Sequence, residues 1–159
     1  MLSVGSNVGD RLAAIQSAVE AFRPWLLAVS PVYETPPWGP VPQADFLNAV
    51  LVATDAQAAP GDWLERAQAA ERAGGRTRDV RWGPRTLDVD VIVVDDVVSA
   101  DPTLTLPHPH AAERAFVLVP WLAVQPDARL SGRSIRELLG ALAPDAVADV
   151  RARADLAVA

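Results

Sequence analysis

Hydrophobic and polar positions in the first third of the chain follow the periods of strands and of one helix. Residues 2–9 (LSVGSNVG) have the pattern of a short strand that ends in a glycine-flanked polar turn. Residues 26–35 also favour a strand, in which Pro31 indicates an edge position or a bulge. Between them Asp10 can cap a helix, and the apolar residues that follow it recur at helical spacing: Leu12, Ile15, Val19 and Phe22.

A proline-rich loop leads to a further strand and a second helix. Residues 36–42 contain four prolines, which hold the loop near one shape. Residues 46–55 are typical of a central strand, in which Asn48 is a polar residue in apolar company. Pro60 suits the first turn of a helix that extends to about Ala73, where two glycines end it.

The stretch from Arg76 to Asp95 changes from a cationic loop to a strand. Its first ten residues hold four arginines against one aspartate, with a Trp-Gly-Pro corner at 82–84. Residues 87–94 (LDVDVIVV) are β-branched and alternate in their first half, which predicts a strand. Side chains two apart on a strand share a face, so we expect Asp88 and Asp90 side by side. The opposite face is expected to carry Leu87, Val89, Val91 and Val93.

Two carboxylates on one strand face, next to an arginine-rich loop, indicate half of a phosphoryl-transfer site. Mg²⁺ is held in proteins by a few carboxylates together with substrate phosphates, and arginine forks suit phosphate oxygens. The alternative is that Asp88 and Asp90 lie on an ordinary solvated sheet face. Ile92 and Val94 are predicted on the same face as the aspartates, which would make that face apolar at its far end and argues against the alternative.

The order of predicted elements to this point is β-α-β-β-α-β. We therefore expect an α+β fold with a ferredoxin-like core, a mainly antiparallel sheet, helices on both faces and a C-terminal α/β extension. In that extension residues 103–110 favour a short strand and a turn that carries both histidines. Residues 112–126 favour a helix in which Pro120 could open a second segment, and Ser134 begins a capping box before a short helix.

Composition narrows the class of protein. At 159 residues, half of them hydrophobic, the chain is expected to form a single domain, 1–159, and to be a monomer. It shows neither an apolar run of membrane-spanning length nor a signal-peptide pattern, so we expect a cytoplasmic protein without a membrane partner. A formal charge of −6 disfavours nucleic acid as a partner. The absence of cysteine and lysine excludes thiolate sites and a P-loop lysine.

Four segments of the chain, in the same order and at similar spacing, match one family. They are residues 5–11 (GSNVGDR), 30–50 (SPVYETPPWGPVPQADFLNAV), 81–95 (RWGPRTLDVDVIVVD) and 104–127 (LTLPHPHAAERAFVLVPWLAVQPD). On these segments the chain resembles the 6-hydroxymethyl-7,8-dihydropterin pyrophosphokinases of folate biosynthesis. These enzymes move a pyrophosphoryl group from ATP to a pterin alcohol and release AMP.

The resemblance implies a role for each matched position. Asp88 and Asp90 are expected to hold two Mg²⁺ ions, with ATP as co-substrate, while Arg76 and Arg85 act as catalytic arginines on the triphosphate. Phe46 and Phe116 are expected to stack on the pterin, and Asn48 to read its edge. The remaining expected substrate contacts are Thr35, Pro36, Trp38 and Trp82. The expected nucleotide contacts are Gln68, Glu71, Arg78, Thr105, His108 and Arg114.

Two departures and two alternatives accompany this interpretation. Only four residues precede Gly5, fewer than the resemblance implies, and His110 stands where relatives often carry arginine. The same D-x-D could serve a nucleotidyltransferase or a phosphohydrolase, which would need no pterin pocket. A non-catalytic ferredoxin-like binding module is the alternative from another class. Such a module would show no metal-dependent binding of nucleotides.

Overall fold

The structure is a computed structural model that describes residues 1–75 and 85–158. Arg76, Arg78 and Trp82, three of the predicted site residues, lie outside the described part of the chain.

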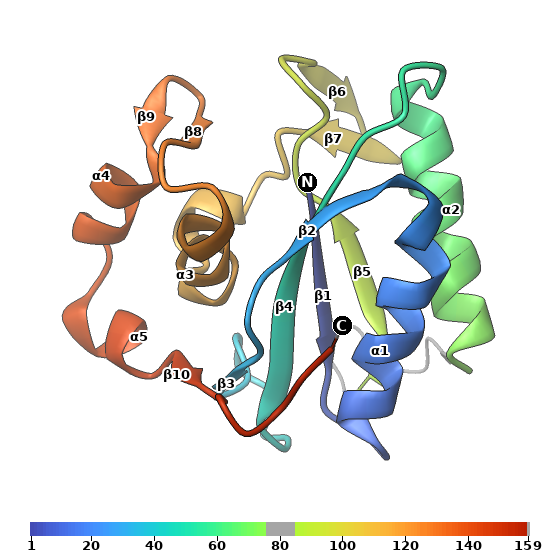
Figure 1. Cartoon of the computed structure of the whole chain (residues 1–159). Coiled ribbons are helices and arrows are strands. Elements are labelled where there is room, and N and C mark those ends of the chain that lie inside the picture. Colours follow the sequence, from blue (N-terminus) through green and yellow to red (C-terminus); the bar gives the residue numbers. More distant parts are fainter. Residues whose placement is uncertain (76–84, 159) are drawn as a thin grey trace.

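An antiparallel sheet of six strands forms the centre of the molecule (Figure 1). The strand order is β10-β3-β4-β1-β5, and β2 also pairs with β4. Every pairing in this sheet is antiparallel. The strands are β1 (Leu2–Ser6), β2 (Leu26–Val29), β3 (Tyr33–Thr35), β4 (Phe46–Ala53), β5 (Asp88–Val91) and β10 (Arg151–Ala152). The prediction of a mixed fold of helices and antiparallel strands is therefore confirmed.

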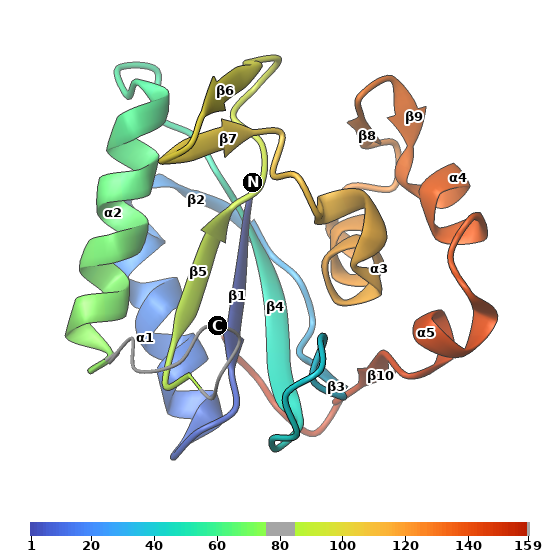
Figure 2. The same ribbon diagram turned by 180° about the vertical axis from the view of Figure 1, so that it is seen from behind.

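Two hydrophobic clusters lie on opposite faces of this sheet. Helices α1 (Arg11–Phe22) and α2 (Pro60–Ala73) pack on one face, against alternate residues of the central strands such as Leu51. Helix α3 (Ala115–Val124) packs on the other face, against Val50. Figure 2, seen from behind, shows α3 on the side of the sheet away from α1 and α2. Because neighbours along a strand point to opposite faces, each central strand supplies both clusters.

The predicted ends of α1, α2 and α4 that rest on capping residues are found where capping chemistry places them. Asp10 Oδ1 accepts a hydrogen bond from the Ala13 amide at 3.0 Å, which starts α1. Helix α2 has the predicted bounds, and Gly75 follows it with a φ of 72°, a left-handed conformation that favours glycine. The capping box at Ser134 starts α4 (Ile135–Gly140), with Ser134 Oγ accepting from the Glu137 amide at 3.2 Å.

The predicted strand over 87–94 is too long, because β5 ends at Val91. The amides of Ile92 and Val93 both donate to the Met1 carbonyl, at 3.0 and 3.4 Å, and this breaks the two-residue alternation. Ile92 still lies on the α3 side as expected. Val93 and Val94 are reversed: Val93 packs in the α3-side cluster and Val94 against the α1/α2-side cluster. The prediction for these two valines was wrong.

Prolines account for two further corrections. The predicted strand over 26–35 is split into β2 and β3, and Pro31, which has no N–H to donate, lies in the gap between them. A bulge is present in β2, between Leu26 and Ala28, and not at Pro31, where the sequence indicated an edge position or a bulge. Pro120 does not open a second segment but lies inside α3, whose apolar residues are buried on both sides of it. That burial outweighs the one backbone hydrogen bond that a proline removes.

The remaining elements surround the sheet. They are the 3₁₀ turns η1 (Arg23–Trp25) and η2 (Ala111–Glu113), the hairpins β6 (Ser99–Asp101) with β7 (Leu104–Leu106) and β8 (Arg129–Leu130) with β9 (Arg133–Ser134), and α5 (Pro144–Ala148). Because η2 precedes it, α3 begins at Ala115, later than the predicted 112. Among the helices of the described residues, none is long and apolar enough to cross a membrane.

Candidate active site

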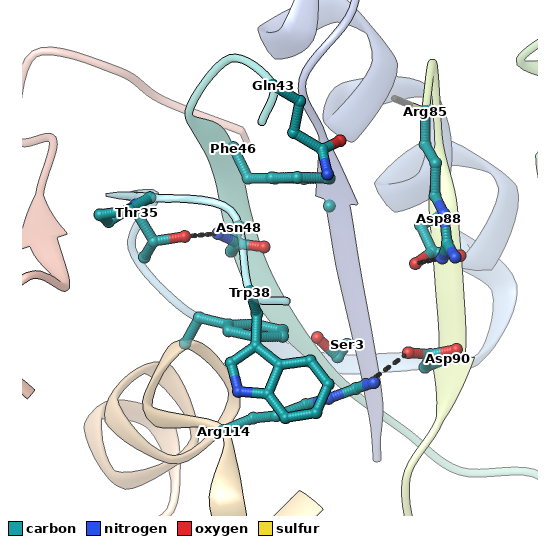
Figure 3. A pocket seen from close by; sticks show the side chains of 13 residues that line it. Ser3, Thr35, Trp38, Gln43, Phe46, Asn48, Arg85, Asp88, Asp90 and Arg114 are labelled. Atoms are coloured by element: carbon teal, nitrogen blue, oxygen red, sulfur yellow. Dashed lines mark hydrogen bonds and ion pairs between the residues drawn. The ribbon is translucent and has the colours of Figure 1, made fainter. Parts of the chain in front are cut away.

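A pocket lies over the α3-side face of the sheet, near the end where β4 begins (Figure 3). It encloses about 600 Å³, part of it open to solvent. Alternate residues of three strands form its floor: Ser3 and Gly5, Phe46 and Asn48, and Asp88 and Asp90. The loop after β3 and the start of α3 form its walls.

The register of the strands brings these floor residues side by side. Gly5 is opposite Asn48 on β4 and opposite Asp88 on β5, while Ser3 is opposite Asp90. A Cβ at position 5 would lie only 2.9 Å from Asn48 Oδ1, so glycine keeps the middle of the floor open. The first strand thus joins the amide of one neighbour to the carboxylates of the other.

One half of the pocket is aromatic with a fixed amide. Phe46, Phe116 and the exposed Trp38 line it. The Asn48 side chain is buried, and its Nδ2 donates to Thr35 Oγ1 at 2.7 Å. That bond fixes the orientation of the amide. All six predicted substrate residues within the described chain, these five and Pro36, therefore line one pocket.

The other half holds two carboxylates, each paired with an arginine. Arg85 forms an ion pair with Asp88, and Arg114 Nη1 donates to Asp90 Oδ2 at 3.1 Å. Burial, and then the charge of Asp88, raise the pKa of Asp90 to about 6. A carboxylate pair whose ionised form is disfavoured in this way is stabilised by an added cation, so the donor set fits Mg²⁺ once phosphate oxygens complete it. Within residues 1–75 and 85–158, no group of three or more His, Cys, Asp or Glu side chains could hold a metal ion by itself.

Arg114 connects the two halves. Its side chain is buried, with 8% exposed. The guanidinium carbon lies 4.9 Å from the ring centre of Trp38 and 5.6 Å from that of Phe116. These are cation–π distances, so the aromatic wall supports the cation that bonds to Asp90. The residue was predicted as a nucleotide contact, and the structure places it beside the aromatic residues as well.

His108 lies next to the carboxylates. Its Nε2 is 3.9 Å from Asp90 Oδ2. Burial, and then the charge of Arg114, lower the pKa of His108 to about 4, so the ring is neutral at pH 7. Its Nδ1 accepts from the His110 amide at 3.2 Å, which leaves the proton of the neutral ring on Nε2. His108 therefore presents an N–H beside Asp90.

Of the other predicted nucleotide residues, the three that the structure describes do not line the pocket. Glu71 is buried on α2, and its Oε1 accepts from the Val89 amide at 2.9 Å, which ties α2 to β5. Gln68 is half-buried one helical turn earlier. Thr105 lies on β7, where its hydroxyl donates to the Asp101 carbonyl at 3.0 Å.

Asn7 was not predicted as a site residue, but its buried side chain joins two walls of the pocket. Its Nδ2 donates to Gln43 Oε1 at 3.0 Å and to the Ala44 carbonyl at 2.9 Å, both in the loop before β4. Its Oδ1 accepts from the Arg85 amide at 2.8 Å, and its own amide donates to the Arg85 carbonyl at 3.1 Å. The glycine-serine-asparagine turn was the available signal. The pocket residues Ser3, Gly5 and Gln43 were also not predicted as site residues.

A structural comparison supports the fold. A crystal structure of Plasmodium falciparum HPPK-DHPS with SDX-DHP aligns with a TM-score of 0.60 and 13% identity, covering 87% of this chain and 42% of that one. The chain thus spans less than half of that protein, and at this identity the likeness shows the fold alone.

Sequence comparisons go further. Proteins named 2-amino-4-hydroxy-6-hydroxymethyldihydropteridine pyrophosphokinase are 50% identical over 157 residues in Mycobacterium bovis, covering 91% of this chain and 84% of that one. In Methylorubrum extorquens the identity is 43% over 150 residues, with 92% and 94% covered, and in Pseudomonas aeruginosa 44% over 145 residues, with 88% and 89% covered. The family model for 7,8-dihydro-6-hydroxymethylpterin-pyrophosphokinase matches residues 1–126. The chain therefore belongs to the 7,8-dihydro-6-hydroxymethylpterin-pyrophosphokinase family.

Proposed function

We propose that this protein transfers pyrophosphate from ATP to 6-hydroxymethyl-7,8-dihydropterin in folate biosynthesis and releases AMP. One observation carries the proposal: an aromatic half-pocket with a fixed amide adjoins a half-pocket with two carboxylates and two arginines. The first half suits a flat heterocycle, and the second suits a polyphosphate with its metal.

The aromatic half is the proposed pterin site. A pterin has aromatic faces and a polar rim, so it needs stacking rings and hydrogen-bonding groups at fixed positions. Phe46 and Phe116 would supply the rings, and Asn48, held by Thr35, would meet the rim without having to be ordered on binding. Pro36 and Trp38 would close the side of the pocket.

The charged half is the proposed site of transfer. The hydroxymethyl oxygen of the pterin attacks the β-phosphorus, gives up its proton to water, and displaces the oxygen that bridges the α- and β-phosphates, which leaves on AMP. Asp88 and Asp90 would hold two Mg²⁺ ions. When bound, these ions would neutralise phosphate charge. Arg85 and Arg114 would neutralise the phosphoryl group in transfer, and neutral His108 would donate a hydrogen bond to a phosphate oxygen.

The remaining roles belong to the same proposal. Arg76 would act on the triphosphate, and Trp82 would help to exclude water from the site. The further proposed nucleotide contacts are Gln68, Glu71, Arg78 and Thr105. We also propose a ferredoxin-like core with a C-terminal extension, a single domain, a monomer and a cytoplasmic location. The strand order β3-β4-β1-β5, with helices after β1 and β4, supports that core.

Product analysis tests the proposal. The protein is incubated with ATP, Mg²⁺ and 6-hydroxymethyl-7,8-dihydropterin, and the products are separated and weighed by mass spectrometry. AMP and a pterin that gains two phosphoryl groups are expected in equal amounts, and neither with Asp90→Asn. Release of ADP or free pyrophosphate would indicate a phosphohydrolase or a nucleotidyltransferase instead. As a control, Asp96→Asn removes one negative charge from an exposed residue outside the pocket, and this variant should keep full activity.

A further inference from the structure

The pocket wall that carries Trp38 is part of a loop, and the two ends of that loop are each held by charged side chains from elsewhere in the chain. Residues 36–45 leave β3 after Thr35 and enter β4 at Phe46, and both of these residues line the pocket. Four prolines stiffen the loop, but stiffness alone does not set where a loop lies. The position of the wall is set by what holds the two ends.

Glu34, at the first end, is held by two arginines. Arg11 Nη1 donates to Glu34 Oε1 at 2.9 Å, and Arg153 Nη1 donates to Glu34 Oε2 at 2.8 Å. Burial alone would raise the pKa of Glu34, but these hydrogen bonds outweigh it and hold that pKa below its ordinary value. Arg11 Nη1 also donates to the carbonyl of Asp45, at the second end of the loop, at 2.9 Å. One guanidinium nitrogen therefore joins the two ends.

The segment 151–158 braces the same two ends. Its strand β10 pairs with β3, with Arg151 opposite Glu34, and the Arg153 amide donates to the Val32 carbonyl at 2.8 Å. Arg151 Nη2 reaches Asp45 Oδ2 at 3.1 Å. The segment is anchored beyond this point, because Gln16 on α1 donates to the Ala157 carbonyl at 2.9 Å. Figure 1 shows β10 beside β3, and the chain after it running past the start of β4 towards α1.

We propose that Glu34 is a positioning residue for the pterin: through Arg11 and Arg153 it fixes the separation of the loop ends and so the pocket wall. The proposal rests on the proposed function of this site. Glu34 does not line the pocket, but it precedes Thr35, which holds the Asn48 amide. A shift of Glu34 moves Thr35 with it, and displaces the amide that would read the pterin edge.

The chain contains a matched control. Asp55 and Arg66 form an ion pair at 2.7 Å whose side chains are 20% and 22% exposed. The Glu34–Arg153 pair, at 2.8 Å, has side chains that are 20% and 29% exposed. Asp55 follows the far end of β4, away from Phe46, and does not line the pocket. Glu34→Ala also removes the ion pair with Arg11, so it should lower stability somewhat more than Asp55→Ala, but only the Glu34 variant should affect the pterin.

The experiment is calorimetric titration of 6-hydroxymethylpterin into the protein with Mg²⁺ and a non-hydrolysable ATP analogue. We expect Glu34→Ala to weaken the pterin Kd by about tenfold, the size of one charge-assisted hydrogen bond. The Kd of the nucleotide analogue alone should change less than about twofold, since the side-chain hydrogen bonds of Glu34 go to Arg11 and Arg153 and not to a proposed nucleotide residue. Hydrogen exchange in residues 36–45 should become faster in the variant. Arg153→Lys should restore part of the affinity that Arg153→Gln loses, because lysine keeps the charge.

Several results would overturn the proposal. One is an unchanged pterin Kd in a folded Glu34→Ala protein, and another is an equal loss of nucleotide affinity. A loss of the same size in Asp55→Ala would show that the effect is a general one on stability. If Glu34→Ala does not fold, Arg153→Gln answers the same question, because it leaves Glu34 with Arg11. A wild-type protein that binds the nucleotide analogue but no pterin would instead overturn the proposed function, before any variant is compared.

Discussion

Asp90→Asn should make the metal-free protein more stable at neutral pH while it removes activity. In the fold, burial and then the charge of Asp88 raise the pKa of Asp90 from its ordinary 3.8 to about 6. At roughly 1.4 kcal/mol for each tenfold change in proton affinity, ionising Asp90 would cost the folded state about 3 kcal/mol. Because 32% of this side chain is exposed, solvent screening reduces the figure, and we expect about 1 kcal/mol.

The pH dependence of this gain follows from its sign. A carboxyl whose pKa is raised on folding holds its proton more tightly in the folded state, so the wild type loses stability as the pH rises from 3.8 towards 6. Asparagine has the shape of the protonated acid and does not titrate. The two proteins should therefore be equally stable near pH 4, should diverge between pH 4 and 6, and should stay about 3 °C apart above it.

Thermal unfolding across this pH range, in the presence of a chelator, measures the difference. Asp96→Asn removes the same formal charge from an exposed turn and should show no such divergence. Adding Mg²⁺ with ATP should then raise the Tm of the wild type more than that of Asp90→Asn. A variant that is less stable than the wild type at pH 8 without metal would refute the reasoning. It would mean that the charge of Asp90 serves the fold, through Arg114.

Three further predictions concern residues under and around the pocket. Asn7→Ala should lower kcat/KM at least tenfold, because the backbone amide of Arg85 loses Asn7 Oδ1 as its acceptor. Steady-state kinetics measure this, and an unchanged kcat/KM would contradict it. Glu71→Ala should lower the free energy of unfolding by about 2 kcal/mol, because it leaves the buried amide of Val89 on β5 without its acceptor. Glu71→Gln keeps an acceptor oxygen and should retain most of that stability, and denaturant unfolding measures both variants. Gly5→Ala should weaken pterin binding about tenfold, as measured by calorimetry, because the new Cβ would lie 2.9 Å from Asn48 Oδ1. An unchanged pterin Kd would show that the Asn48 amide can move aside at little cost.

Local sequence patterns were sufficient for the elements whose signals are strong over many residues. Helix α2 has the predicted bounds because a proline at its start and two glycines after it act through backbone geometry alone. The apolar run of β4 likewise indicated its central position. The boundaries failed where a distant residue decides them, as at β5, whose end is set by the Met1 carbonyl.

The site was predictable residue by residue only in part, because its assembly depends on register. Nothing local to Gly5 indicates that it will lie between Asn48 and Asp88, and this pairing is what makes one pocket of two strands. Asn7 was missed for the same reason: its partners Gln43 and Arg85 are far from it in the sequence. The resemblance to a family supplied residue types for the pocket, but not the contacts that hold them.

The two faces of the sheet explain how this fold can hold two neighbouring carboxylates that lower its stability. On β5, Val89 belongs to the α1/α2-side cluster, while its neighbours Asp88 and Asp90 face the pocket. The same strand is therefore held by apolar burial on one face, and it carries two carboxylates on the other, where burial, and then the charge of Asp88, raise the pKa of Asp90. Substitutions on the α1/α2 face should act on stability and those on the pocket face on binding. Asp90→Asn is the sharpest case, because it should improve stability while it weakens the binding of Mg²⁺ with ATP and abolishes activity.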